Sequence, residues 1–290
     1  MAVNALFDVP APAKLNLFLH VAGTRADGYH LLDSRMVLID WHDTLHFERR
    51  ADGGLARHDL GAALPDDDLC LRAARALRDA AGSSDGVDIS IDKRVPWGAG
   101  LGGGSSDAAS TLLALNVLWR LDWPLERLLP IGLRLGADVP FFLAGTPARV
   151  GGVGERLVPE PFEAAWYAVL KPPAALSTQA VFASPEVAQC VEAARIAGFS
   201  QGSSRDEGRN DLQAAAEALC PDVARAAAQL FAAFGNSRMT GSGSAVFARA
   251  GDGPAQAAAM PSVGREGWSG RMCRSLERHP LAGWARSGEV

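Results

Sequence analysis

The feature that most constrains this chain is the glycine-rich stretch PWGAGLGGGSSDAAS at residues 96–110, in which five glycines fall within seven positions. Glycine is unfavourable inside helices and strands by roughly 0.5–1 kcal/mol relative to alanine, so this stretch is predicted to form a loop. Such a loop brings backbone N–H groups close to an anion. Three interpretations follow: a site for a nucleotide's phosphates, a site for a dinucleotide's pyrophosphate, or a sharp turn alone.

The surroundings of the loop argue against two well-known nucleotide sites. Gly98, Gly100 and Gly103 satisfy G-x-G-x-x-G, but the dinucleotide version follows a buried parallel strand and needs an acidic residue about 20 residues further on. The preceding segment 86–92 alternates polar and apolar residues, as a half-exposed strand does. The aspartate at residue 122 follows a predicted helix rather than a strand. The P-loop pattern also fails, because no Gly-Lys-Ser/Thr closes the stretch.

A helix is predicted directly after the loop, beginning near Ser105 and continuing through STLLALNVLWRL. Its unpaired N–H groups and the positive end of its dipole would face an anion held by the loop. Ser105 and Ser106 can cap this helix or donate to phosphate oxygens. Asp107 suits the helix dipole but repels a phosphate, so we expect it to cap the helix or to help hold a cation.

Periodicity in the rest of the chain predicts an α+β fold with antiparallel strands rather than regular βαβ units. Strand patterns occur in KLNLFLHVAG, in several pieces of LLDSRMVLIDWHDTLHFERR and in AWYAVLKP. Helical patterns occur in LCLRAARALRDAAG, in PLERLLPIGLRLG and twice within 211–234, and SRMTGSGSAVFARAG is predicted as strand, tight turn and strand. A second glycine cluster, ARVGGVGE, predicts a boundary between a domain at 1–155 and one at 156–290.

Composition and charge narrow the range of partners. The chain has 290 residues, of which 48% are apolar, which is enough for a large core. A net charge of −5 with no basic run argues against nucleic acid, although a local site can still bind an anionic small molecule. The four cysteines are scattered, so we expect reduced, buried thiols rather than a metal site. No apolar run reaches membrane length, and we expect a cytoplasmic protein.

Several segments resemble the GHMP kinases, a family that phosphorylates small molecules. PWGAGLGGGSSDAA is similar to their phosphate-binding motif, and GADVPFFLAG, GVGE and TGSGSAVFA are similar to further family segments. The N-terminal block APAKLNLFLHVAGTRADGYHLL resembles the motif of one member. That member phosphorylates the 2-hydroxyl of cytidine diphosphate-linked methylerythritol in isoprenoid precursor biosynthesis. The resemblance runs from about residue 10 to 250.

The resemblance implies a two-domain GHMP kinase fold, in which the first domain is like domain 2 of ribosomal protein S5 and the second is ferredoxin-like. ATP and substrate are expected in the cleft between them, with Mg²⁺ accompanying ATP. Where the family usually has asparagine this chain has Asp68, which can accept a hydrogen bond from the adenine amino group but cannot donate one. The ATP-binding residues that the resemblance implies are Asp68, Lys93, Pro96, Trp97, Gly98, Ala99, Gly100, Leu101, Gly102, Gly103, Gly104, Ser105 and Ser106.

For catalysis, the resemblance implies Asp138 as the base and Lys14 as its neighbour. The local sequence is compatible with this role, because Asp138 lies in the short Gly- and Pro-bounded segment GADVP, which can present a side chain into a cleft. Lys14 lies with Asn16 on the polar face of the first predicted strand. Without the motif, an aspartate in a turn is usually a cap and a lysine is usually a solvated charge.

For the substrate, the resemblance places the cytosine among Tyr29, His30 and Phe182. An aromatic sandwich suits a flat base, and His30 can hydrogen-bond its edge. Thr178 is a neighbour of the same pocket, and Asn16 is expected to contact substrate hydroxyls. The resemblance also puts Gly241 and Gly243 near the substrate's phosphates, although this segment could equally be a tight turn between strands.

Other interpretations remain open at this stage. The chain could act on a sugar, on homoserine or on a relative of mevalonate, as other GHMP kinases do. It could also bind a nucleotide without catalysis, in which case Lys14 and Asp138 would lie far apart. Ser105, Ser106 and Asp107 are the nearest candidates for Mg²⁺, and none is assigned. We expect a monomer or a homodimer.

Overall fold

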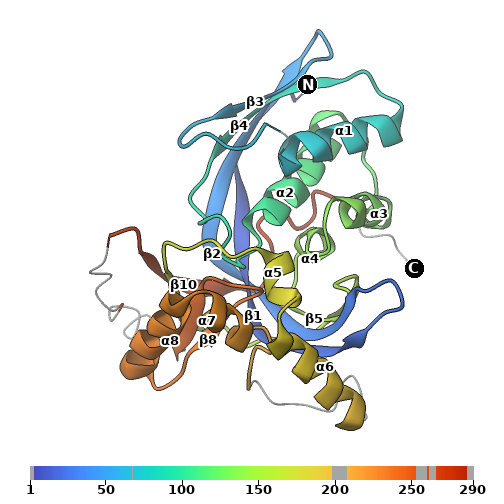
Figure 1. Cartoon of the computed structure of the whole chain (residues 1–290). Coiled ribbons are helices and arrows are strands. Elements are labelled where there is room, and N and C mark those ends of the chain that lie inside the picture. Colours follow the sequence, from blue (N-terminus) through green and yellow to red (C-terminus); the bar gives the residue numbers. More distant parts are fainter. Residues whose placement is uncertain (1–2, 67, 198–207, 253–259, 261–265, 286–290) are drawn as a thin grey trace.

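One continuous sheet organises the chain, with helices packed against two separate regions of it (Figure 1). A computed structural model describes residues 3–66, 68–197, 208–252, 260 and 266–285. The ten strands of the sheet found in these residues follow the order β3-β4-β2-β10-β7-β9-β8, with β1 and β5 also paired to β2 and β6 paired to β5.

The N-terminal region contains helices on one face of the long strands. Its elements are β1 (Ala5–Thr24), β2 (His30–Arg50), β3 (Leu55–Asp59), α1 (Leu69–Ala81), β4 (Gly86–Asp92), α2 (Gly103–Leu118), α3 (Leu125–Leu135), α4 (Val139–Ala144), β5 (Ala148–Gly152) and β6 (Arg156–Pro159). The four helices lie together beside β1 and β2, on the right in Figure 1. A core of buried side chains that includes Phe47, Ile89, Leu112 and Phe141 fills the space between helices and sheet.

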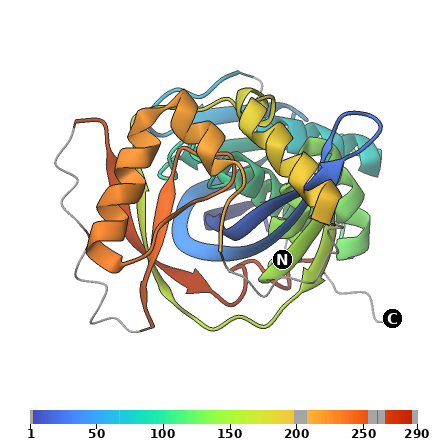
Figure 2. The same cartoon turned by 60° about the horizontal axis from the view of Figure 1, so that its bottom comes forward.

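The C-terminal region forms a smaller layer of antiparallel strands covered by helices. Its elements are β7 (Trp166–Lys171), α5 (Thr178–Phe182), α6 (Pro185–Ala197), α7 (Gln213–Leu219), α8 (Pro221–Phe234), β8 (Arg238–Met239), β9 (Val246–Gly251) and β10 (Ser269–Leu276). Figure 2 shows α6 (yellow) and α8 (orange) on the outside of this region. The antiparallel strands with helices on one side correspond to the ferredoxin-like part of the two-domain α+β GHMP kinase fold.

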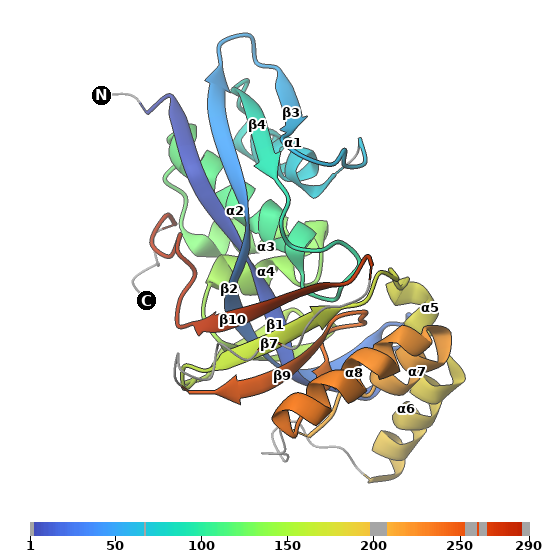
Figure 3. The same cartoon turned by 90° about the vertical axis from the view of Figure 1, so that its left-hand side faces the viewer.

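Two strands belong to both regions. β1 and β2 pair antiparallel from Ala5 opposite Glu48 to Thr24 opposite His30, and in Figure 3 they run from the N-terminal region down to the level of β7 and β9. β2 also pairs with β4, β5 and β10. The far end of β1 packs into the second region's core, where Leu19 and Val21 join residues of β7, α7 and α8.

Several predicted elements agree with the structure and one group does not. The alternation in β4 is confirmed, because Val87, Ile89 and Ile91 are buried while the intervening polar residues are half-buried. The several strands predicted between residues 31 and 50 are wrong, since this segment is the single strand β2. Most of its central part is buried, including the polar Asp33, Ser34 and Asp43, so it can run as one strand through both regions. The boundary predicted at residue 155 falls in the turn between β5 and β6 and stays a prediction.

Three of the four cysteines are buried as expected. All four cysteines are free, and Cys70, Cys220 and Cys273 are buried while Cys190 is half-buried. Among the described residues, no helix is both long enough and apolar enough to cross a membrane. The segment SQGSSRDEGRN at 200–210, whose polar composition predicts an exposed loop, falls mostly outside the described residues.

Candidate active site

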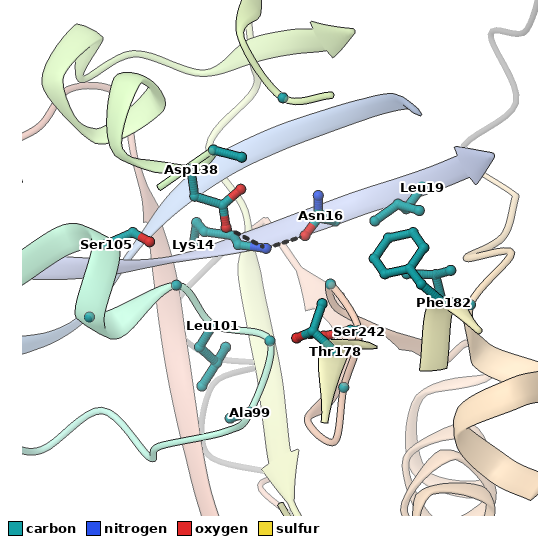
Figure 4. A pocket seen from close by; sticks show the side chains of 18 of the residues that line it. Lys14, Asn16, Leu19, Ala99, Leu101, Ser105, Asp138, Thr178, Phe182 and Ser242 are labelled. Carbon is teal, nitrogen blue, oxygen red and sulfur yellow. Dashed lines mark hydrogen bonds and ion pairs between the residues drawn. The ribbon is translucent and has the colours of Figure 1, made fainter. Parts of the chain in front are cut away.

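A cleft of about 1020 Å³ lies where the two regions meet (Figure 4). Single small-molecule sites typically have volumes of about 300–1,000 Å³, so this cleft lies at the upper end of that range. It is lined by residues from β1, α5 and both glycine-rich segments. The predicted site residues found in its lining are Lys14, Asn16, Tyr29, His30, Lys93, Pro96, Trp97, Gly98, Ala99, Gly100, Leu101, Gly102, Gly103, Gly104, Ser105, Asp138, Thr178, Phe182, Gly241 and Gly243.

The first glycine turn, residues 98–102, leads directly into a helix. Gly98, Gly100 and Gly102 have φ values of 62°, 72° and 71°, a region that favours glycine. α2 starts at Gly103, two residues earlier than predicted, and its first hydrogen bond runs from the Ser106 N–H to the Gly102 carbonyl at 2.9 Å. The three N–H groups at 103–105 therefore have no partner within the helix and form a cradle for an anion.

Two residues predicted to bind ATP are absent from the cleft lining. The Ser106 hydroxyl is buried and donates to the Pro12 carbonyl at 2.7 Å, so it neither caps α2 nor faces a phosphate. Asp68 is the N-cap of α1, where its carboxylate accepts from the Leu71 N–H at 3.0 Å and pairs with Arg57 at 3.2 Å. Its oxygens are used for folding, whereas the adjacent Leu69 lines the cleft.

Lys93 lies between two carboxylates beneath the cradle. Its ammonium pairs with Asp43 and, at 2.6 Å, with Asp107. The cation that Asp107 holds is therefore a lysine side chain. Burial raises the pKa of Asp107 to about 8, with the lysine opposing the shift and the Asp43 carboxylate adding to it. Burial lowers the pKa of Lys93, but the two carboxylates outweigh this and raise it.

Lys14 and Asp138 meet at the edge of the cradle, although they are far apart in the sequence. The distance from Lys14 Nζ to Asp138 Oδ2 is 3.7 Å (Figure 4). Asp138 directly precedes α4 and makes no capping bond, which leaves its side chain 30% exposed to the cleft. Burial lowers the pKa of the Lys14 ammonium despite the opposing effect of Asp138. An ammonium and a carboxylate in contact beside an anion cradle can serve phosphoryl transfer.

The register of β1 aims Lys14 and Asn16 at the cleft. The pairing with β2 shifts between Pro12 and Lys14 and again between Asn16 and Phe18, and such bulges redirect side chains beside functional sites. The Lys14 N–H is thereby free to donate to the Leu101 carbonyl at 3.0 Å. The Asn16 side chain accepts from Lys14 Nζ, and its own amide donates to the Ser34 hydroxyl at 2.8 Å.

The second glycine turn, residues 240–244, packs directly on the first. Thr240 is fully buried, and its hydroxyl accepts from the Asn16 N–H at 2.9 Å. The Ala245 N–H donates to the Ala99 carbonyl at 3.0 Å. A Cβ on Gly241 would lie 2.8 Å from the Gly100 oxygen and 3.2 Å from Lys14 Nζ. The two turns and the lysine are therefore in mutual contact.

Aromatic side chains lie at the other end of the cleft. The rings of His30 and Phe182 stack with centroids 5.2 Å apart and planes 17° apart. Tyr29 lines the cleft with 64% of its surface exposed. The Thr178 hydroxyl is 2.8 Å from that of Ser242, so α5 and the second glycine turn are linked across the cleft. Flat, partly exposed rings of this kind suit a planar heterocycle.

Sequence reasoning missed several residues at the site. Ser242 and Gly154 line the cleft, and both could have been found because they lie inside glycine segments that the sequence singles out. Asp43 carries no such signal, since it is one acid within a long strand whose partner Lys93 is 50 residues away. No motif or pattern in the sequence singles out Asn210 either.

The fold, the anion cradle at the start of a helix and the lysine–aspartate pair together define a GHMP kinase, which uses ATP to phosphorylate a small molecule. The family described as "GHMP kinases N terminal domain" matches residues 68–146, and "GHMP kinases C terminal" matches residues 189–266.

Full-length relatives define the branch of this class: the chain belongs to the family of 4-diphosphocytidyl-2-C-methyl-D-erythritol kinases. It is 60% identical to the protein of that name from Methylibium petroleiphilum, over 98% of this chain and 100% of the relative. It is 52% identical to the one from Verminephrobacter eiseniae, over 98% and 99% of the two chains.

Solved structures agree on the fold. A crystal structure of 4-(cytidine 5'-diphospho)-2C-methyl-D-erythritol kinase matches with a TM-score of 0.72 and 35% identity, covering 91% of this chain and 98% of the other. A homoserine kinase from Cytophaga hutchinsonii matches with a TM-score of 0.70 but 18% identity, covering 96% of each chain, and shows the shared fold alone.

Proposed function

We propose that this chain transfers the γ-phosphoryl group of ATP to the 2-hydroxyl of 4-diphosphocytidyl-2-C-methyl-D-erythritol. The products are ADP and the 2-phosphate, in the non-mevalonate route to isoprenoid precursors. Relatives that carry the name of this kinase cover almost the whole chain at 50–60% identity, which supports the substrate.

The observation that carries the proposal is the pairing of Lys14 with Asp138 at 3.7 Å beside the N–H cradle of α2. A nucleotide binder without catalysis would have no need to bury a lysine against an aspartate at this point. The aromatic pair of His30 and Phe182 lines the same cleft. The cleft therefore offers a place for a triphosphate, a place for a base and a reactive pair between them.

In this proposal Asp138 orients the substrate hydroxyl and accepts its proton late in the reaction. A carboxylate is a weak base toward an alcohol, but the loose transition state of phosphoryl transfer lets the proton move after most of the bond to the leaving oxygen has broken. Lys14 stabilises the developing alkoxide and the γ-phosphate oxygens. Its burial strengthens this electrostatic effect because little water screens the charge.

The remaining predicted residues take binding roles. Tyr29, His30 and Phe182 hold the cytosine, and Asn16 and Thr178 face the substrate's polar groups. Gly241 and Gly243 line the cleft. The Gly243 N–H donates to the Thr240 carbonyl at 3.0 Å, so the Gly241 N–H is the candidate donor to the substrate's diphosphate. On the ATP side, the segment from Pro96 to Ser105 encloses the phosphates, and Lys93 supports it from below.

Mg²⁺ accompanies ATP in reactions of this type and neutralises charge on the phosphates. Among the described residues, no group of three or more His, Cys, Asp or Glu side chains could hold a metal ion. Asp107 is paired to Lys93, and the Ser106 hydroxyl is bonded to Pro12. These contacts fit an ion held mainly by triphosphate oxygens and water, as Mg²⁺ often is, with the Ser105 hydroxyl as the candidate protein ligand.

The test replaces each member of the reactive pair. Asp138→Asn and Lys14→Ala are expected to fold normally, while kcat falls about 10²–10⁴-fold in a coupled assay of ADP release. Turnover near the wild-type rate in Asp138→Asn would refute the assignment. His30→Ala is expected to raise KM for the cytidine substrate about 10-fold or more with little effect on KM for ATP, because it removes one stacking partner.

The choice of substrate is tested with the wild-type protein. ADP should form with the cytidine diphosphate-linked alcohol and not with homoserine, mevalonate or a hexose. Release of ADP with one of those alcohols instead would contradict the proposed substrate and assign the chain the activity of a different GHMP kinase. The cytoplasmic location and the monomeric or homodimeric state expected from the sequence stay predictions.

A further inference from the structure

Asn210 lies next to β1 and the second glycine turn without lining the cleft itself. Its segment runs beside β1, because the Leu19 N–H donates to the Arg209 carbonyl at 3.0 Å and the Asp211 N–H donates to the Leu19 carbonyl at 2.8 Å. The following residue, Leu212, is fully buried in the core of the second region. Asn210 itself is 5% exposed, so its position is fixed on several sides.

The side chain of Asn210 is used almost completely by backbone groups. Its amide nitrogen donates to the Met239 carbonyl at 2.9 Å and to the Gly241 carbonyl at 2.8 Å, while its oxygen accepts from the Leu212 N–H at 2.9 Å. Two carbonyls require two donors on one atom, which a neutral amide supplies and a carboxylate of the same shape does not. The donors thus hold both ends of the segment 239–241.

The held segment touches the reactive lysine. Gly241 has φ of 56°, and a Cβ there would lie 3.2 Å from Lys14 Nζ and 2.8 Å from the Gly100 oxygen. A small movement of the Gly241 backbone would therefore change the position of the ammonium and of the Gly100 carbonyl. Misplacement of reacting groups by about 1 Å can reduce rates on the order of 10²-fold.

We propose that Asn210 is a positioning residue for phosphoryl transfer, which acts by holding the second glycine turn against Lys14 and Gly100. This inference rests on the proposed function, because it states what the hydrogen bonds do for that reaction. β8, the strand before the turn, has two residues, so its ladder alone provides little support. The amide of Asn210 provides the support from outside the hairpin.

The first test compares Asn210→Ala with Asn210→Asp. Both are expected to lower kcat about 10- to 100-fold while KM for ATP changes less than about threefold, because the cradle at the start of α2 is left in place. The Asp variant separates two explanations, since it keeps the shape but loses both donors. A space-filling role predicts wild-type turnover in Asn210→Asp, and that result would overturn the proposal.

The chain offers a control in Asn236, which is exposed where Asn210 is buried but makes the same kinds of bond to the backbone. Its amide nitrogen donates to the Phe234 and Arg249 carbonyls, each at 3.0 Å, and its oxygen accepts from the Arg249 N–H at 2.8 Å. This is the same pattern of three backbone bonds at the end of β8 away from the cleft. Asn236→Ala should keep kcat within about twofold when all variants are assayed well below their unfolding midpoints. An equal loss in both alanine variants would show a general effect on stability and would overturn the proposal.

A second measurement does not depend on activity. Amide hydrogen exchange without ligands should speed up in residues 239–246 of Asn210→Asp while remaining unchanged in the N-terminal half of α2. Unchanged exchange in 239–246 would contradict the support that we assign to Asn210. If the wild-type protein released no ADP with the cytidine substrate, the proposed function would fail, and the exchange experiment would still decide whether Asn210 holds the turn.

Discussion

The two glycine turns of the cleft look alike in sequence but are held in different ways. Turn 98–102 leads into α2, a 16-residue helix that is buried along most of its length. Turn 240–244 joins β8 to β9 and has no helix behind it. The first turn therefore receives its geometry and its unpaired N–H groups from a helix end. The second depends on side-chain hydrogen bonds, in which its own Thr240 hydroxyl accepts from the Asn16 N–H and the Asn210 amide donates to the Gly241 carbonyl.

The supports also differ in charge. Beneath the first turn the ammonium of Lys93 lies between the carboxylates of Asp43 and Asp107. The second turn is held by a neutral amide and a hydroxyl. Glycine in a sequence thus shows where backbone can approach a ligand or another backbone, but it does not show what keeps that backbone in place. The supports follow from the tertiary structure.

The largest effect is expected where the two turns meet, at Gly100. Its φ is 72°, and a Cβ there would overlap the Thr240 carbonyl oxygen. Gly100→Ala should lower the free energy of unfolding by about 2–5 kcal/mol, from the backbone strain plus the overlap. It should also reduce kcat/KM at least about 100-fold, since both turns must shift. Urea unfolding and the ADP assay measure the two effects.

Gly104 provides the control for that change within the same motif. It lies inside α2, and the nearest atom to an added Cβ is 3.5 Å away, in ordinary contact. Gly104→Ala should therefore raise the free energy of unfolding by about 0.5–1 kcal/mol, as alanine does in a helix. Equal destabilisation by both variants would mean that the contact between the turns is unimportant.

A moderate effect of pH on the free energy of unfolding is expected. It should arise from Asp107, which supports the first turn, and not from the residues that hold the second turn. The pKa of Asp107 is raised from 3.8 to about 8 by burial, so between these values the folded protein binds one proton more than the unfolded chain. The free energy of unfolding should then fall as pH rises, by up to about 1.4 kcal/mol per pH unit, and level off above about pH 8.

The variant Asp107→Asn isolates this contribution, because asparagine resembles the protonated carboxyl. Its stability relative to wild type should rise steadily from pH 5 to pH 8, measured by urea unfolding at several pH values. Asn210→Ala, in the second turn's support, neither adds nor removes a titrating group and serves as the comparison. A constant difference between Asp107→Asn and wild type across this range would show that Asp107 is ionised throughout.

The smallest effects separate two neighbouring serines at the start of α2. Ser105→Ala should raise KM for ATP roughly 3- to 10-fold, as expected for one lost hydrogen bond. Ser106→Ala should leave KM for ATP unchanged but lower the free energy of unfolding by about 1–2 kcal/mol, because the buried Pro12 carbonyl loses its donor. Reversed results would mean that the cradle binds ATP through the other serine.

Features set by local sequence could be predicted well. The alternation of β4 predicts its buried face, and Gly82 predicts the end of α1, where it adopts a φ of 60° and donates back to the last turn. The glycine-rich stretch predicts a loop before a helix. Lys14 and Asp138, which the resemblance to a family brings into one site, lie 3.7 Å apart.

Features set by contacts between distant residues could not be predicted. Ser106 bonds to Pro12, 94 residues away, and the hydrogen bond from Asn210 to Gly241 spans 31 residues. The resemblance implies Asp68 as an adenine contact, whereas in the structure its carboxylate caps α1 by accepting from the Leu71 N–H. In each case a polar side chain has several possible partners, and only the fold selects one.

The long strands shared by the two regions bear on how the enzyme can move. Rigid closure of two domains requires a junction at which a few residues absorb the change in backbone angles. Here β1 and β2 cross the junction as a ladder that stays paired on both sides of each local register shift, from Ala5 opposite Glu48 to Thr24 opposite His30, so a large bend there would break hydrogen bonds. We therefore expect bound ligands to be enclosed by movement of short segments around the cleft and not by closure of the two regions. Residues 25–29, residues 96–102 and α5 can move without breaking that ladder.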